Sequence, residues 1–232
     1  MKKIVLMAVL YTLFSFNALY PANAETEAQF FLYIGSGNIE EVSNYIDDKK
    51  ININAKLDDG MTPLILSIVY KQDEIAKMLI EKGANLNIKD KSGFTALIHS
   101  IMKNRTEVSK MLIEKKADVN IKLSLNENGI YMKNFTPLLL NENKEVAQSL
   151  INAGADINIK FTAKYPGQDI KLENATPLMW FILNDNTEIA ELLIESGADI
   201  NAKDKRGNTA LDYAKEKNNT KIEQLLIAKG AN

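Results

Sequence analysis

The feature that most constrains the fold is an internal repeat. A Thr-Pro-Leu or Thr-Ala-Leu triplet recurs through the chain, and successive triplets lie 33, 41, 40 and 33 residues apart. The triplets begin at Thr62, Thr95, Thr136, Thr176 and Thr209. In four of the five repeats a turn residue follows the threonine at a distance of 21 residues: Gly83, Lys116, Gly197 and Gly230. Periods of this size indicate stacked units, each of which buries its apolar face only against its neighbours.

Each repeat is predicted to contain two short helices and a return loop. Thr62 can cap a helix whose first residue is Pro63, because that position needs no backbone N–H. The apolar residues within 64–68 recur at helical spacing, and the polar stretch 71–73 separates them from a second helix. Gly83 then supplies the left-handed residue that ends the second helix. Helices this short are marginal alone, so stacking must stabilise them.

These residues resemble the ankyrin-repeat family. The likeness is carried by the segments 90–97 and 188–202 and by the 33-residue period, which is that of the family. Residues 30–54 resemble a degenerate first repeat, in which Gly37-Asn38-Ile39-Glu40 opens the second helix. The resemblance implies an all-α fold, an ankyrin-repeat α-solenoid of helix–turn–helix units joined by β-hairpin loops, two of which are extended.

The repeat pattern divides the chain into seven predicted segments. They are a signal peptide (1–24), a degenerate N-terminal capping repeat (25–56), ankyrin repeats at 57–89 and 90–122, an ankyrin repeat with a loop insertion and a shortened first helix (123–160), an ankyrin repeat with a loop insertion (161–202), and a C-terminal capping repeat (203–232).

The chain departs from the family pattern at three points. The histidine that usually follows Thr-Pro-Leu is missing from every repeat. Lys116 replaces the turn glycine of its repeat, and a side chain in the left-handed region costs about 1 kcal/mol or more. In the third triplet repeat, which is the fourth repeat of the chain when the degenerate one is counted, only 18 residues separate Thr136 from Gly154, so its first helix is expected to shrink to about residues 137–140.

The first 24 residues have the pattern of a secretory signal peptide. Lys2 and Lys3 precede an apolar run over residues 4–16, and Ala22-Asn23-Ala24 provides a small-residue cleavage site. We expect cleavage before Glu25 and export to the periplasm or beyond the cell. The alternative is an uncleaved leader that tethers the protein to a membrane.

Composition restricts the chemistry. The charge of 28 basic against 30 acidic residues argues against nucleic-acid binding, which needs a basic excess. The chain has no cysteine and one histidine, so no catalytic, cofactor-binding or metal-binding residues are predicted. The alternative from another class is a metal carrier or hydrolase that uses His99 and loop carboxylates.

The expected function is therefore non-catalytic binding of a protein by a monomer with no stable membrane insertion. The ankyrin resemblance implies that the residue before each triplet threonine and the residue four after it face the concave side. The predicted partner-binding residues are Met61, Phe94, His99, Tyr131, Phe135, Tyr165, Trp180 and Tyr213. Two alternatives stay open: these side chains pack between repeats as ordinary core, or the protein is a secreted factor acting on another cell's proteins.

Two loop insertions are the most individual feature of the sequence. The step from the loop Asn to the next triplet threonine is 8 residues in the regular repeat, but 16 from Asn120 and 18 from Asn158. Both inserted segments alternate apolar and polar residues around a turn signal, which predicts β-hairpins. The predicted strands are 121–125 with 130–133 and 159–165 with 170–172, with the two hairpins pairing laterally and carrying partner specificity. Disordered loops are the alternative. One face is expected to gather Ile121, Leu123, Leu125, Ile130, Phe161 and Ile170, with Tyr131 and Tyr165 near the rim.

Overall fold

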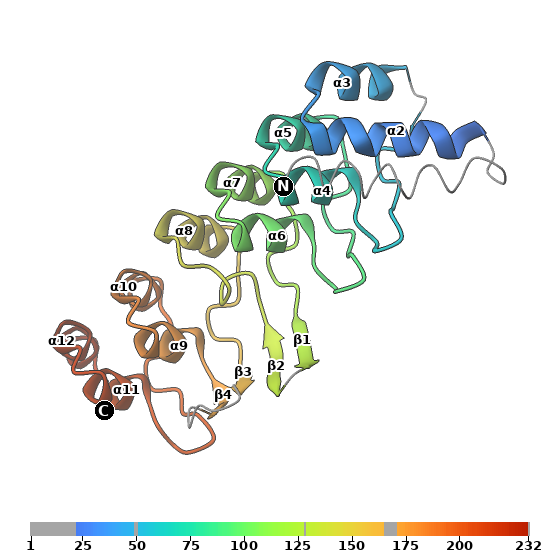
Figure 1. Cartoon of the computed structure of the whole chain (residues 1–232). Coiled ribbons are helices and arrows are strands. Elements are labelled where there is room, and N and C mark those ends of the chain that lie inside the picture. The colour runs from blue at the N-terminus through green and yellow to red at the C-terminus, as the bar shows by residue number, and fades with distance from the viewer. Residues whose placement is uncertain (1–21, 49–50, 128, 165–170, 232) are drawn as a thin grey trace. The chain divides into compact units, whose positions relative to one another are not determined.

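The structure is a computed structural model that describes residues 22–48, 51–127, 129–164 and 171–231. It divides into two compact units, an N-terminal unit that ends at Val108 and a C-terminal unit that begins at Ser109 (Figure 1). The predicted leader lies outside the described residues except for residues 22–24, and the predicted site residue Tyr165 lies outside them as well. Within the described ranges, no helix combines the length and the apolar character needed to cross a membrane.

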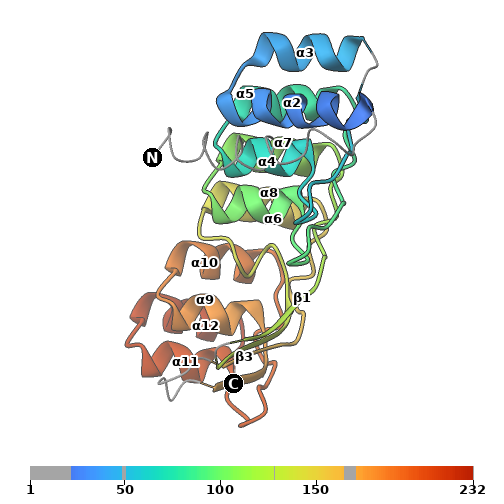
Figure 2. The ribbon, with the colours of Figure 1, turned by 45° about the vertical axis from the view of Figure 1, so that its right-hand side comes forward.

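The N-terminal unit is built of helix pairs. Its helices are α2 (Ala22–Ser36), α3 (Ile39–Asp47), α4 (Pro63–Val69), α5 (Asp73–Glu81), α6 (Ala96–Met102) and the beginning of α7 (Thr106–Glu114). The first helices α2, α4 and α6 pack in series as one layer, and α3 packs on α5 in a second layer (Figure 2). The degenerate first repeat is therefore a helix pair, as its sequence indicated.

The ends of these helices follow from single residues. The Thr62 hydroxyl accepts a hydrogen bond from the Ile65 N–H at 3.3 Å, and Pro63 is the first residue of α4, as expected. Gly83 ends the second helix of this repeat with a φ of 85°. Between the two helices, Lys71 adopts a φ of 61°, a left-handed residue that the sequence analysis did not identify.

The C-terminal unit repeats the two-layer arrangement. Its helices are α8 (Lys144–Asn152), α9 (Pro177–Leu183), α10 (Thr187–Glu195), α11 (Ala210–Glu216) and α12 (Thr220–Ala228). The first helices α9 and α11 pack together, and α10 packs between α8 and α12. At the start of α11 the Asp212 carboxylate accepts from the Thr209 backbone N–H and hydroxyl, both at 2.8 Å. These two bonds lower the pKa of Asp212.

The third triplet repeat, the fourth repeat of the chain, lacks its first helix. Residues 137–140 form a hydrogen-bonded turn, in which the Leu140 N–H donates to Thr136 at 3.3 Å and the Asn141 N–H donates to Leu138 at 3.2 Å. The expected short helix is thus reduced to a turn. The reason is the short spacing between Thr136 and the start of α8. The Asn143 side chain already caps α8, accepting from the Glu145 N–H at 2.9 Å, so too few residues remain for a helix before it.

The two insertions form one four-stranded sheet. Its strands are β1 (Leu123–Glu127), β2 (Ile130–Phe135), β3 (Phe161–Lys164) and β4 (Lys171–Ala175), in the spatial order β1-β2-β3-β4. Each hairpin is antiparallel, and β2 pairs with β3 through the register Tyr131↔Lys164, Met132↔Ala163 and Lys133↔Thr162. The lateral pairing of the hairpins is confirmed. The strand boundaries differ, because β1 and β3 begin two residues later than expected and β2 and β4 continue to the helical layer.

A bulge in each hairpin sets which side chains share a face. The register shifts beside Leu123 and beside Phe161, where Asn134 and Asn174 are the extra residues of the partner strands. These two asparagines have φ values of 59° and 57°. Because of the bulges, one face carries Leu123, Leu125, Ile130, Met132, Phe135, Phe161, Ala163, Leu172 and Ala175. The expected face is therefore largely right, although Ile121 precedes the sheet and Ile170 lies outside the described residues.

Candidate functional site

His99, the only histidine of the chain, belongs to the packing of the N-terminal unit. It lies on α6 and is 8% exposed, with its Nε2 atom 2.7 Å from Asp90 Oδ2. The Asp90 Oδ1 atom accepts from the backbone N–H groups of Ser92 and Phe94, both at 2.9 Å. The half-buried Phe94 ring meets the imidazole edge-on with centroids 5.7 Å apart. His99 thus holds the loop before its own helix.

Tyr213 has the same role in the last repeat. Its side chain is 2% exposed, and its hydroxyl donates to Asp204 Oδ2 at 2.8 Å. Burial raises the pKa of the Tyr213 phenol, and the bond to Asp204 raises it further. The aspartate precedes the triplet threonine by five residues and the donor follows it by four, as with Asp90 and His99.

Three aromatic rings join the sheet to α9. Phe135 at the end of β2, Phe161 at the start of β3 and Trp180 on α9 form three edge-to-face pairs, with centroids 5.2 to 5.8 Å apart. Phe135 and Phe161 are each 1% exposed, whereas Trp180 is partly accessible. Such pairs add stability beyond the burial of area. The cluster fixes the base of the hairpins on the helical layer.

The opposite face of the sheet is polar and partly accessible. We call it the polar face; its described side chains are Ser124, Asn126, Tyr131, Lys133, Thr162, Lys164 and Glu173. The Lys164 ammonium lies 5.2 Å from the Tyr131 ring centroid and 3.1 Å from the Glu173 carboxylate, which Lys205 also contacts. Tyr131 therefore stands within the polar face and not at its rim.

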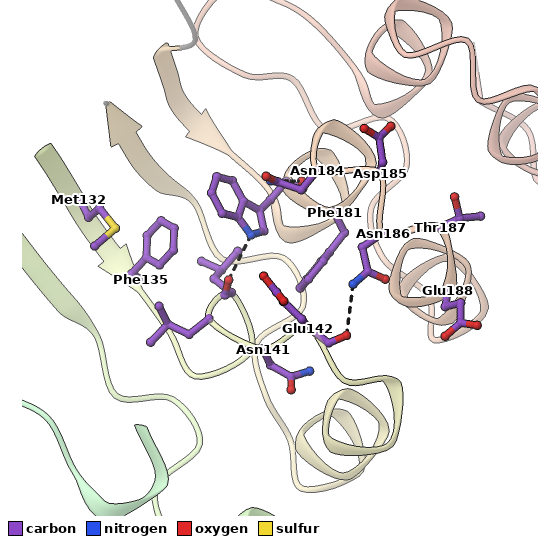
Figure 3. A pocket seen from close by; sticks show the side chains of 13 residues that line it. Met132, Phe135, Asn141, Glu142, Phe181, Asn184, Asp185, Asn186, Thr187 and Glu188 are labelled. Carbon is purple, nitrogen blue, oxygen red and sulfur yellow. Dashed lines mark hydrogen bonds between the residues drawn. The ribbon is translucent and has the colours of Figure 1, made fainter. Parts of the chain in front are cut away.

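A pocket of about 670 Å³ lies where the fourth repeat has lost its first helix (Figure 3). We call it the Trp180 pocket. Its apolar lining is Met132, Phe135, Leu139, Leu140, Trp180 and Phe181. Its polar lining is Asn141, Glu142, Asn184, Asp185, Asn186, Thr187 and Glu188. The segment 139–142 and the segment from the end of α9 to the start of α10 therefore supply all the lining residues except Met132 and Phe135.

Hydrogen bonds between repeats hold these walls. The Trp180 indole N–H donates to the Leu139 carbonyl at 3.1 Å, and the Asn186 side chain donates to the Glu142 carbonyl at 3.3 Å (Figure 3). Asn141 is 2% exposed, and its amide donates to the Asn143 carbonyl at 2.7 Å. The turn that replaces the missing helix is thus tied to the next repeat by side chains.

The pocket carries acidic charge. Glu142, Asp185 and Glu188 line it, and no lysine, arginine or histidine does so among the described residues. Asp185 has a basic neighbour, the Lys217 ammonium at 2.6 Å.

The spacing between Thr136 and Gly154 predicted the shortened first helix, but no signal in the sequence indicated a pocket beside it. Among the described residues, no group of three His, Cys, Asp or Glu side chains is placed to bind a metal ion.

Comparison with known sequences decides the family. The sequence pattern of the family described as ankyrin repeats (3 copies) matches residues 30–122 and 138–232, more than half of the chain. The chain is an ankyrin-repeat protein. Ankyrin repeats are protein–protein interaction modules, so the family indicates a protein as the class of partner. A comparison with curated proteins gives no match.

Two solved structures resemble this ankyrin-repeat protein. One is a chain of the complex of a predatory endopeptidase from Bdellovibrio bacteriovorus with an immunity protein, at 29% identity and a TM-score of 0.64, covering 86% of this chain and 97% of that one. The other is an ankyrin repeat domain from Acinetobacter baumannii AYE, at 25% identity and a TM-score of 0.70, covering 89% of this chain and all of that one. Both confirm the repeat fold.

The structure separates the predicted partner-binding residues of this ankyrin-repeat protein into two groups. His99, Phe135 and Tyr213 are buried in the repeats, which is the packing alternative. The others within the described ranges keep accessible surface: Met61, Phe94, Tyr131 and Trp180. Of the seven that lie within the described ranges, only Phe135 and Trp180 line the Trp180 pocket. Their role in binding stays a prediction.

Proposed function

We propose that this ankyrin-repeat protein is a non-catalytic binding protein, exported from the cytoplasm, that holds a protein partner on the inserted four-stranded sheet and in the Trp180 pocket. The observation that carries the proposal is the Trp180 pocket, which opens where the fourth repeat departs from the family pattern. Pockets with apolar walls and a polar rim are the usual form of a binding site. The two insertions support the same proposal, because loops longer than a connection requires often carry function.

Electrostatics supports a site that recognises rather than reacts. Two charges of the polar face are paired with each other, since Lys164 contacts Glu173, which Lys205 from outside the face also contacts. Protein interfaces combine apolar contacts at the centre with hydrogen bonds at the rim. The partly accessible Tyr131 and Trp180 belong to residue types that often dominate binding energy.

Deletion of the inserted strands tests this function. Removing residues 124–131 and 162–171 restores the 8-residue step in both repeats and retains Phe135 and Phe161. We expect the shortened protein to unfold as cooperatively as the parent and to lose its partner in affinity capture from the native envelope. A photo-cross-linking residue at position 131 should label the same partner, and one at position 224, on α12, should not. Retrieval of the same partner at the same affinity by the shortened protein would contradict the proposal.

A peptidase is a second, narrower candidate for the partner. The observation that favours it is the 29% identity to a chain from the complex of an endopeptidase with an immunity protein. By this likeness the chain would hold a peptidase in an inactive complex, either in its own envelope or on another cell's enzyme. The measurement is the activity of the captured partner with and without this protein. A partner with no peptidase activity in either state would exclude the candidate.

A further inference from the structure

We propose that the Trp180 pocket binds a segment of the partner in which a large apolar side chain stands next to a lysine or arginine. The inference rests on the proposed function and specifies the chemistry that its site recognises. It commits to a peptide segment with an apolar anchor and an adjacent positive charge.

The apolar anchor follows from the walls of the pocket. Leu140 and Trp180 are partly accessible there, with Phe135 and Phe181 buried behind the surface. The pocket volume of about 670 Å³ exceeds what one side chain fills, so it accepts an anchor together with part of its flanking chain. Burial of apolar area against such walls is the main favourable contribution in a pocket of this kind.

The pocket is formed before the partner arrives. The Trp180 indole N–H is held by the Leu139 carbonyl at 3.1 Å, and the edge-to-face contacts of this ring with Phe135 and Phe161 fix its orientation. The Asn186 side chain bridges to the Glu142 carbonyl at 3.3 Å on the opposite side. A preformed site loses less conformational entropy on binding, which favours affinity.

The positive charge follows from the rim. Among the described residues no basic side chain lies within 4.0 Å of the carboxylates of Glu142 or Glu188, and only Asp185 has such a partner, Lys217. The neighbouring start of α10 does not neutralise this charge fully, since the Asn186 side chain already accepts from the Ile189 N–H at 3.1 Å. A cation beside the anchor would therefore gain from the rim, and an anion would be repelled.

The single tryptophan of the chain makes this testable by fluorescence, because Trp180 lines the pocket. The probes are blocked tetrapeptides, Gly-Leu-Arg-Gly and its two relatives with Glu in place of Arg or Ala in place of Leu, added to the full chain. We expect a saturable change in emission with the Leu-Arg peptide. Each replacement should weaken binding by about fivefold or more. On the scale where about 1.4 kcal/mol is a factor of ten, fivefold is about 1 kcal/mol.

A matched pair of variants assigns the charge preference to the rim. E142Q/E188Q should retain the binding of the Leu-Arg peptide in weakened form and lose the preference for Arg over Glu. E114Q/E195Q changes two exposed glutamates outside the pocket and should bind like the parent. Far-ultraviolet circular dichroism and thermal melting confirm that each variant is folded.

Two results would overturn the inference. One is the absence of a saturable emission change with any peptide, and the other is equal binding of the Arg and Glu peptides. Either result leaves the proposed function standing if position 131 still cross-links the partner. Loss of that cross-link, with the peptide preference intact, would instead contradict the proposed function and retain the pocket chemistry.

Discussion

Lys116 occupies a turn at which the other four triplet repeats carry glycine. Its φ is 64°, and the glycines at the same place, Gly83, Gly154, Gly197 and Gly230, have φ values of 85°, 87°, 84° and 89°. The left-handed backbone that the sequence predicted for Lys116 is therefore confirmed. An L-residue with a Cβ atom is strained there, and glycine is not.

Replacing this lysine should stabilise the protein. We expect Lys116→Gly to raise the free energy of unfolding by about 1 kcal/mol, since it relieves the strain and removes only an exposed side chain. Urea unfolding followed by circular dichroism measures the change. The matched control is Gly197→Lys, where an added Cβ would meet no atom within 4 Å, so only the backbone is strained. If the control also stabilises the protein, strain does not govern this turn.

His99 and Tyr213 occupy the same position in their repeats, and each bonds the equivalent aspartate of its own repeat with a different donor group. The Asp90 side chain is 5% exposed, and without the imidazole its Oδ2 atom would lose a bond at 2.7 Å. We expect His99→Phe to cost about 1–3 kcal/mol, the usual penalty for a buried polar group left unpaired. His99→Tyr should cost less, because Tyr213 makes the equivalent bond to Asp204. Equal losses in urea unfolding for the two variants would show that the bond to Asp90 contributes little.

At the scale of single elements, the turn at residues 137–140 is the weakest described part of its layer. It has two backbone bonds, at 3.3 and 3.2 Å, where α9 has a continuous helical ladder. Local opening needs less free energy where fewer bonds must break. Amide hydrogen exchange should therefore be faster over residues 136–142 than over α9. Equal protection would show that the contacts from Trp180 and Asn186 brace the turn as strongly as a helix.

The predictable part of each element was local chemistry. Thr62 followed by Pro63 marked where α4 begins, and Gly83 marked where α5 ends. The hairpins were predictable because alternation and turn residues lie close together in the chain. Lys71, with its φ of 61°, carries no signal of its own, and the left-handed Asn104, Asp185 and Asn218 at the same place in other repeats are the signal that the sequence analysis did not use. The Trp180 pocket was not predictable either, because the spacing that indicated the shortened helix does not determine whether neighbouring side chains fill the space it leaves.

Two predicted partner-binding residues, His99 and Tyr213, are buried, although the ankyrin resemblance placed them on an accessible face. Each donates to an aspartate of its own repeat. The deciding partner lies five residues before the triplet threonine, whereas the predicted binding positions were the residue before that threonine and the residue four after it. A polar side chain can therefore be withdrawn from the surface by one acceptor elsewhere in the repeat.

At the scale of the whole molecule, export remains a prediction of the first 24 residues. Cleavage before Glu25 would remove the first three residues of α2 and leave Phe30 and Ile34, which are fully buried in the N-terminal unit. We expect protein from the native host to begin at Glu25 and to fractionate without membranes. Intact-mass spectrometry measures this directly, and a chain that still carries Met1 and sediments with membranes would contradict the export proposal.

The pairing of β2 with β3 also has a consequence for how such a chain can change. The two hairpins belong to consecutive repeats, yet each supplies the strand that covers an edge of the other. Loss of one insertion alone would leave the surviving hairpin with an open edge, which invites pairing with strands of other chains. We therefore expect the two insertions to be kept or lost together during evolution, although they are separate in the sequence.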